Sequence, residues 1–236
     1  MNNLYNRSAK NKLFVDLFFA IIAFIFYSFV PLIMAIDSDH LFAYSLVTLV
    51  ASFGLFLICY RFIRNLDESF QIKKMPFSIG AVVIVAVLFC SFVLQNAIGF
   101  FRSQVLPQTQ LETSNQDAIA NLLQVDDLLI YSLITMVIIA PLFEELIFRR
   151  ILIGNTFASK KVLVPRIIMS VSVFAMLHVF SEFSSGVIPF LFSLATYLII
   201  SGSFTLIYVF TSRMLYSVLA HILNNLLAAL LLLSQM

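Results

Sequence analysis

The stretch APLFEELIFRR, residues 140–150, places four charged side chains inside a long apolar segment. A charged side chain at the centre of a membrane helix costs about 2.5–3.5 kcal/mol on insertion scales, so these charges must pair or face a polar cavity. Glu145 and Arg149 are spaced i, i+4 and can pair on one helix face, whereas Glu144 points about 100° away without a local partner. Pro141 removes a backbone hydrogen bond beside Glu144 and can open space there.

The whole chain has the composition of a membrane protein. Of its 236 residues, 61% are hydrophobic and 11% are charged, whereas soluble domains have about 45–50% and about 25%. The mean hydropathy is +1.03, and the net charge is only +2, without a basic block. These values exclude a soluble enzyme, a disordered chain and a nucleic-acid binder, and they leave a polytopic membrane protein.

The apolar segments are numerous enough to cross a bilayer several times. A membrane helix needs about 20 mostly apolar residues. The sequence contains seven such segments, at residues 12–36, 41–63, 77–101, 128–157, 163–181, 187–212 and 214–233. We therefore expect an all-α fold, a polytopic integral membrane bundle of about seven transmembrane helices. We expect one membrane domain over residues 1–236, with three helices and an outside polar loop in residues 1–127.

The charges outside the apolar segments predict the orientation of the bundle. With the amino terminus in the cytoplasm, the basic residues that fall on the inner side are Arg7, Lys10, Lys12, Arg61, Arg64, Lys73, Lys74, Lys160, Lys161, Arg166 and Arg213. The outer side then carries only Arg102, at the start of a polar loop over residues 102–127, together with most of the acidic residues. The positive-inside rule therefore predicts that the amino terminus lies inside and the carboxyl terminus outside.

Two of the three histidines lie inside apolar segments, His178 in the fifth and His221 in the seventh. Glu144 precedes the turn expected at residues 160–161 by nearly as many residues as His178 follows it. In a helical hairpin this spacing predicts similar depths for the two side chains. His221 lies nearer the cytoplasmic end of its segment, and it reaches the same depth if Arg213 lies within the bundle.

Glu144, His178, His221 and Asn225 are residue types that together suffice to hydrolyse a peptide bond. A carboxylate can act as a general base on water, and a histidine can hold that water or bind a metal. A second imidazole and an amide N–H can stabilise a developing oxyanion. Asn225 follows His221 by four residues and therefore shares its helix face. The sequence contains neither an HExxH motif nor paired membrane aspartates.

These features also have simpler interpretations. The charges of residues 144–150 can form a buried ion-pair staple, and a lone membrane histidine can bridge two helices. Buried glutamate and histidine side chains also form proton relays in transporters, although the sequence shows no repeated halves. The small loops also allow a non-catalytic membrane scaffold or immunity protein that binds a sensor kinase, a bacteriocin or a receptor.

Three motifs, taken in order, resemble those of one protease family. EELIFR at residues 144–149 resembles the motif EExxxR, FAMLH at residues 174–178 resembles FxxxH, and HILNN at residues 221–225 resembles HxxxN. Their order and spacing resemble the CPBP family, which includes Rce1-like CAAX proteases and bacteriocin-processing or Abi-domain proteins. The resemblance makes residues 128–233 the expected catalytic core, whereas residues 1–127 match only as generic membrane helices.

The resemblance implies an intramembrane endopeptidase of the glutamate or metalloprotease type. It assigns Glu144 to the activation of water, His178 to assisting it, and His221 with Asn225 to oxyanion stabilisation. By the same resemblance, supporting roles fall to Glu145, Arg149 and Phe174. Glu144, His178 and His221 can also bind zinc, and the sequence does not choose between a metal-free and a zinc-dependent site.

The resemblance also implies a partner, a membrane-associated peptide or protein that serves as substrate. A compact chain with short loops, rich in Phe, Ile and Asn, is typical of a bacterial member, which places it in the plasma membrane. For such members the resemblance suggests bacteriocin immunity or the processing of peptides and pheromones.

Overall fold

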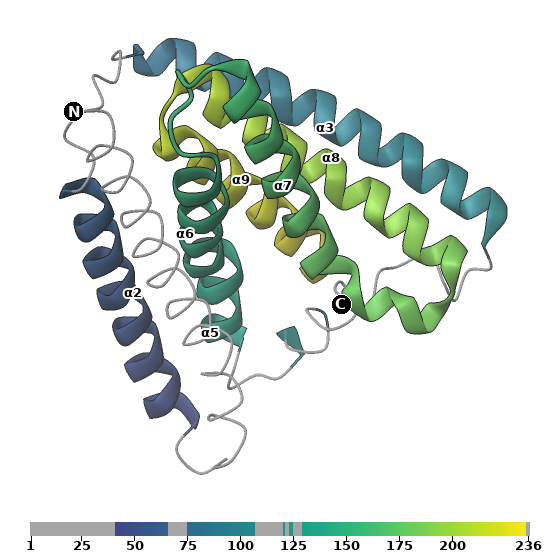
Figure 1. Ribbon diagram of the computed structural model, residues 1–236. Coiled ribbons are helices and arrows are strands. Elements are labelled where there is room, and N and C mark those ends of the chain that lie inside the picture. The colour runs from purple at the N-terminus through teal and green to yellow at the C-terminus, as the bar shows by residue number, and fades with distance from the viewer. Residues whose placement is uncertain (1–40, 66–74, 107–119, 121–122, 125–128, 235–236) are drawn as a thin grey trace.

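The computed structural model describes residues 41–65, 75–106, 120, 123–124 and 129–234 (Figure 1). The regular elements in these ranges are all helical, and the ranges contain no strand. The elements are α2 (Leu41–Asn65), α3 (Phe77–Val105), α5 (Leu129–Ile134), η4 (Thr135–Ile139), α6 (Ala140–Glu145), η5 (Leu146–Ile153), α7 (Lys160–Val179), η6 (Phe180–Ser185), α8 (Val187–Thr211) and α9 (Met214–Leu233). The four elements from α5 to η5 follow one another without a break, and we call them together the glutamate helix.

Within the described residues, the helices long and apolar enough to cross a membrane are five: Phe77–Val105, Leu129–Ile153, Lys160–Ser185, Val187–Thr211 and Met214–Leu233. They coincide with five of the seven predicted segments. α2 coincides with the segment predicted at residues 41–63, and its described apolar part spans Ser45–Leu57. The segment predicted at residues 12–36 lies outside the described residues. The chain is a multi-pass membrane protein.

The outward faces of the helices are apolar. On α3, for example, Val82, Val85 and Phe89 are 67–68% exposed. A soluble protein rarely leaves so large a contiguous apolar surface uncovered, whereas the hydrocarbon of a bilayer can cover it. The polar and charged side chains near the glutamates therefore have to find their partners inside the bundle.

α3, α7, α8 and α9 form the body of the bundle, with α3 alongside α8, while α2 lies beside the glutamate helix (Figure 1). One core that joins α3, α8 and α9 consists of Ile84, Phe204, Ile207, Tyr216 and Ala220. A second core that joins α2 to the glutamate helix consists of Phe56, Ile139, Phe143, Leu146 and Ile151. These two cores fix the glutamate helix and α9 on either side of the candidate site.

α3 and α9 approach each other closely at Gly80. A Cβ atom added to Gly80 would overlap the ring of Tyr216, which is almost fully buried on α9. The Tyr216 hydroxyl donates a hydrogen bond to the carbonyl oxygen of Met75, at 3.2 Å. The absence of a side chain at residue 80 is thus what allows α9 to lie against α3.

The glutamate helix changes its hydrogen-bond register twice. In η4 the N–H of Ala140 donates to the carbonyl of Thr135, and at the end of η5 the N–H of Gly154 donates to the carbonyl of Arg149. Both bonds span five residues, which is π-helical spacing. The short α6 segment between them carries both glutamates. π-Helical turns are rare and occur frequently at functional sites.

The structure corrects the expected position of Arg102. The charge pattern placed it at the start of an outside loop, but α3 continues to Val105 and Arg102 is buried within it. Its Nη1 atom donates to the hydroxyl of Ser193 on α8, at 3.0 Å. Most of the predicted loop of residues 102–127 lies outside the described residues.

Candidate active site

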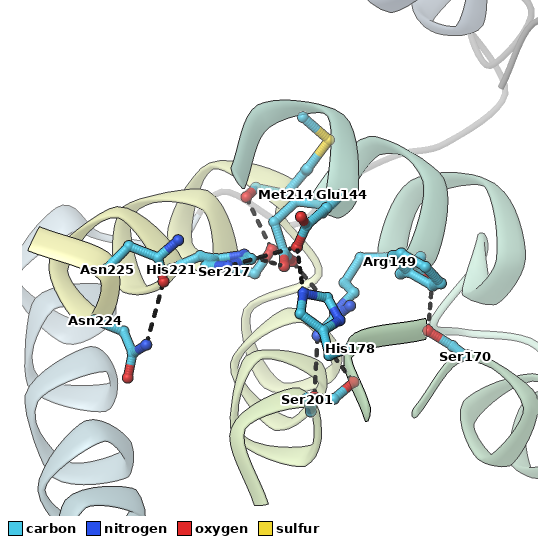
Figure 2. Close-up of polar contacts among 12 residues, drawn as sticks. Glu144, Arg149, Ser170, His178, Ser201, Met214, Ser217, His221, Asn224 and Asn225 are labelled. Atoms are coloured by element: carbon cyan, nitrogen blue, oxygen red, sulfur yellow. Dashed lines mark hydrogen bonds and ion pairs between the residues drawn. The ribbon is translucent and has the colours of Figure 1, made fainter. Parts of the chain in front are cut away.

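Three side chains from three helices converge at one point in the bundle (Figure 2). Glu144 comes from α6, His178 from the last turn of α7 and His221 from the middle of α9. The Glu144 Oε2 atom lies 3.8 Å from Nε2 of His178 and 3.7 Å from Nε2 of His221. The meeting of these side chains, expected from their depths in the sequence, is confirmed.

The hydrogen bonds of the two rings define which nitrogen carries the proton. Nδ1 of His178 lies 2.8 Å from the carbonyl oxygen of Phe174, and Nδ1 of His221 lies 3.0 Å from Oε1 of Glu145. Both partners are acceptors, so each Nδ1 is the donor, and each Nε2 has a lone pair when its ring is neutral. Two imidazole nitrogens, each an acceptor in the neutral ring, therefore face the Glu144 carboxylate.

The three converging atoms do not form direct hydrogen bonds with one another. Glu144 Oε2 is buried and accepts no hydrogen bond from the described residues. Its separations from the two Nε2 atoms are too long for direct hydrogen bonds. A water molecule at hydrogen-bonding distance from all three atoms can donate its two hydrogens among them.

Glu145 points to the other side and forms a buried charge pair. Its Oε2 atom lies 3.3 Å from Nε of Arg149, and both side chains are fully buried. Nη2 of Arg149 donates to the carbonyl oxygen of Ser201 at 3.0 Å and lies 3.3 Å from its hydroxyl. The predicted i, i+4 pairing is confirmed. Its effect at the site is that Glu145 holds Nδ1 of His221 and so directs Nε2 toward Glu144.

Aromatic rings hold both histidines in place. Phe174 stacks on His178 at 4.2 Å between ring centroids, with Tyr197 stacked at 4.9 Å. Phe204 stacks on His221 at 4.3 Å. The Arg149 guanidinium lies 5.0 Å from the Phe174 ring and 5.7 Å from the Phe204 ring, within cation–π distance of each. The supporting position predicted for Phe174 therefore has a counterpart in Phe204.

The sequence did not single out Tyr197, Ser201 or Phe204. All three belong to α8, a helix without any charged residue or histidine. Aromatic and serine side chains in an apolar helix are too common to mark a site, in a chain with 26 Phe and 8 Tyr. No signal in a single sequence distinguishes these three from their neighbours.

Asn225 lies one turn after His221 on α9, at the end of the cluster in Figure 2. Its Nδ2 atom donates to the carbonyl oxygen of Met136 at 2.9 Å, and its Oδ1 atom accepts from Asn224 at 3.3 Å. Among the described residues, no hydrogen bond joins Asn225 to Glu144. The amide retains one hydrogen on Nδ2 beyond the one given to Met136.

The polar side chains differ in their access to the surroundings. The side chains of His178 and Glu144 are 22% and 15% exposed, whereas those of His221, Glu145 and Arg149 are at most 4% exposed. Among the described residues of the cluster, Glu144 and His178 are thus the side chains most open to the surroundings.

Glu144, His178 and His221 are the donor types of a zinc site. In the part of the chain that the structure describes, however, no group of three His, Cys, Asp or Glu side chains is arranged to hold a metal ion.

Comparison with known proteins identifies the region that contains the site. Residues 126–227 match the family model of the type II CAAX prenyl endopeptidase Rce1-like proteins. The match includes all three motifs and confirms the family resemblance found in the sequence. Searches of curated proteins and of solved structures gave no match.

Proposed function

We propose that this chain is an intramembrane endopeptidase. The premise is that residues 126–227 match the family model of the Rce1-like type II CAAX prenyl endopeptidases. The proposed substrate is a membrane-associated peptide or protein. The observation that carries the proposal is the convergence of the Glu144 carboxylate with two imidazole nitrogens, His178 Nε2 and His221 Nε2, from separate helices. This arrangement suits a general base and its water better than a structural ion pair, because the ion pair is already made by Glu145 and Arg149.

The first chemical step is the activation of water. Water bound between the three atoms gives one proton to the Glu144 carboxylate while its second hydrogen bonds to His178 Nε2. The resulting hydroxide adds to the carbonyl carbon of the scissile bond and forms a tetrahedral oxyanion. Glu144 then gives its proton to the leaving amine as the C–N bond breaks, so that it serves as base and then as acid.

The oxyanion is stabilised by His221 and Asn225. Glu145 accepts the Nδ1 hydrogen of His221 and can balance a positive charge on this ring. In this step the His221 ring is protonated on both nitrogens, so Nε2 donates a hydrogen bond to the oxyanion and keeps its proton, and only His178 Nε2 accepts from the water. The second Nδ2 hydrogen of Asn225, on the same face of α9, is the other donor. Glu145, Arg149 and Phe174 act through the side chains they hold.

The proposal includes the architecture around this site. The chain has seven transmembrane helices with the amino terminus inside, in a single domain, and it resides in a bacterial plasma membrane. Residues 1–127 supply three helices and an outside loop, and residues 128–233 form the catalytic core. Its biological role is in bacteriocin immunity or in the processing of a peptide or pheromone.

A comparison of cells that produce the wild type or Glu144→Gln tests the function. We expect the variant to insert and fold, while specific peptides disappear from the membrane peptidome. Purified wild type should also cleave an internally quenched peptide with an S-farnesyl cysteine in a CAAX sequence, with about a 10²-fold or greater loss in the variant. Identical peptidomes, with a phenotype that survives the substitution, would instead support a non-catalytic scaffold.

A further inference from the structure

Pro141 leaves one backbone carbonyl of the glutamate helix without its helical donor. At the end of η4 the N–H of Ala140 donates to the carbonyl of Thr135, five residues earlier. In the same register the next N–H, at residue 141, would serve the carbonyl of Met136. Proline has no N–H, so the carbonyl of Met136 needs a donor from elsewhere.

Asn225 supplies that donor from a different helix. Its Nδ2 atom lies 2.9 Å from the carbonyl oxygen of Met136, a good hydrogen-bond distance. At the other end of the amide, Oδ1 accepts a hydrogen bond from Asn224 at 3.3 Å. The amide plane of Asn225 is thus held at both ends.

This bond is one of the polar links between α9 and the glutamate helix near the site. Another joins His221 to Glu145, at 3.0 Å. His221 and Asn225 are one turn apart on α9, while Met136 and Glu145 lie on either side of Pro141 and Glu144 in the sequence. The two links therefore fix α9 against the glutamate helix both before and after the proposed base.

We propose that Pro141 is a positioning residue of this site. Because proline has no N–H, the carbonyl of Met136 is left for Asn225, and this bond fixes the Asn225 amide one turn from His221, whose Nε2 faces Glu144. The structural coupling of residues 141 and 225 stands by itself. Only its catalytic consequence rests on the proposed endopeptidase function.

The coupling is tested without a substrate, by a double-mutant cycle of Pro141→Ala and Asn225→Ala. In purified protein the readouts are thermal unfolding in detergent and the ¹⁵N resonances of labelled histidine, of which the chain has only three. Pro165 lies inside α7 and is exposed, so Pro165→Ala is the matched control background.

We expect Asn225→Ala to lower the Tm and shift the His221 resonances in two backgrounds, the wild type and the Pro165→Ala control, which both keep Pro141. Once residue 141 is alanine, its N–H can serve Met136, and the same Asn225→Ala substitution should have a much smaller effect. Equal effects of Asn225→Ala in all three backgrounds would overturn the proposal.

Measuring both Tm and kcat of Pro141→Ala distinguishes a positioning role of Pro141 from a purely structural one. Pro141→Ala should keep or raise the Tm, because a helix-interior proline is removed, while kcat for the farnesylated CAAX peptide falls roughly ten-fold at unchanged KM. An unchanged kcat, with Glu144→Gln inactive, would overturn the positioning role and leave the endopeptidase intact. If the wild type does not cleave this peptide, the endopeptidase proposal is weakened, and the cycle alone decides the coupling.

Discussion

Glu144 and Glu145 are adjacent in the sequence but have opposite surroundings. Glu145 is fully buried between Arg149 and His221, at 3.3 Å and 3.0 Å. Glu144 is partly exposed and faces two acceptor nitrogens. The first arrangement satisfies a charge and supports the fold, whereas the second leaves a carboxylate available to take a proton. Two neighbouring carboxylates therefore have different environments, one in a buried charge pair and one beside two histidines.

This difference predicts opposite effects of the same substitution. Glu145→Gln should destabilise the protein by about 3–5 kcal/mol, because it leaves the Arg149 guanidinium buried without its counter-charge. Glu144→Gln is the matched control and should change stability little, since Glu144 Oε2 accepts no hydrogen bond from the described residues. Reversible unfolding in mixed micelles measures both. An equal loss of stability in the two variants would contradict this division of roles.

The sequence was informative for some residues and silent for others, for a physical reason. Glu144, Glu145, Arg149, His178 and His221 could be found because polar side chains are costly inside apolar segments. Tyr197, Ser201 and Phe204 touch the same cluster, but their residue types carry no such cost and give no signal. The position of Arg102 was predicted wrongly because a charge near the end of an apolar run resembles the start of a loop. In the structure its guanidinium donates a hydrogen bond to the Ser193 hydroxyl inside the bundle.

Among the helices, the ranges were predictable and the irregularities were not. Membrane-length apolar runs determine where α3, α7, α8 and α9 lie. The π-helical turns of η4 and η5 leave no mark in the hydropathy pattern, and the carbonyl of Met136 in η4 bonds to Asn225 from another helix. Asn225 itself was predicted as an oxyanion donor. Its bond to the carbonyl of Met136 could not be predicted, because it depends on the π-helical register of η4 before Pro141.

The contact between α3 and α9 gives a prediction with a control on the same helix. Gly80→Ala should destabilise the bundle by about 1–3 kcal/mol, because the added methyl group meets the buried ring of Tyr216. Gly99→Ala meets nothing within 4 Å and should be neutral or stabilising by up to about 1 kcal/mol. Thermal unfolding of both variants in one detergent checks this pair. A Gly80→Ala protein as stable as the wild type would show that α3 and α9 separate easily.

The molecule as a whole joins a membrane bundle to a polar centre enclosed by three of its helices and lined by a fourth. Its composition already required a membrane, and the described helices fit that requirement. The orientation of the bundle is predicted from the charges in its loops. The segment at residues 12–36 is predicted from its hydropathy.

The predicted topology can be checked by labelling single cysteines. In a chain with Cys59 and Cys90 replaced by serine, Ser114→Cys should react with a membrane-impermeant maleimide added to intact cells. Lys161→Cys should react only after the cells are permeabilised, because the basic turn is expected in the cytoplasm. Labelling of Lys161→Cys in intact cells would reverse the orientation.

Glu144 is proposed to activate water for the cleavage of a peptide bond, and an isotope experiment tests this directly. Purified protein is added to membranes that lack it, in H₂¹⁸O and with a strong chelator, and new carboxyl termini are identified by mass spectrometry. The wild type should produce peptides whose new carboxyl groups contain ¹⁸O, with no zinc found in the protein by elemental analysis, and Glu144→Gln should produce none. The same ¹⁸O-labelled peptides from both proteins, or cleavage that the chelator abolishes and zinc restores, would contradict the account.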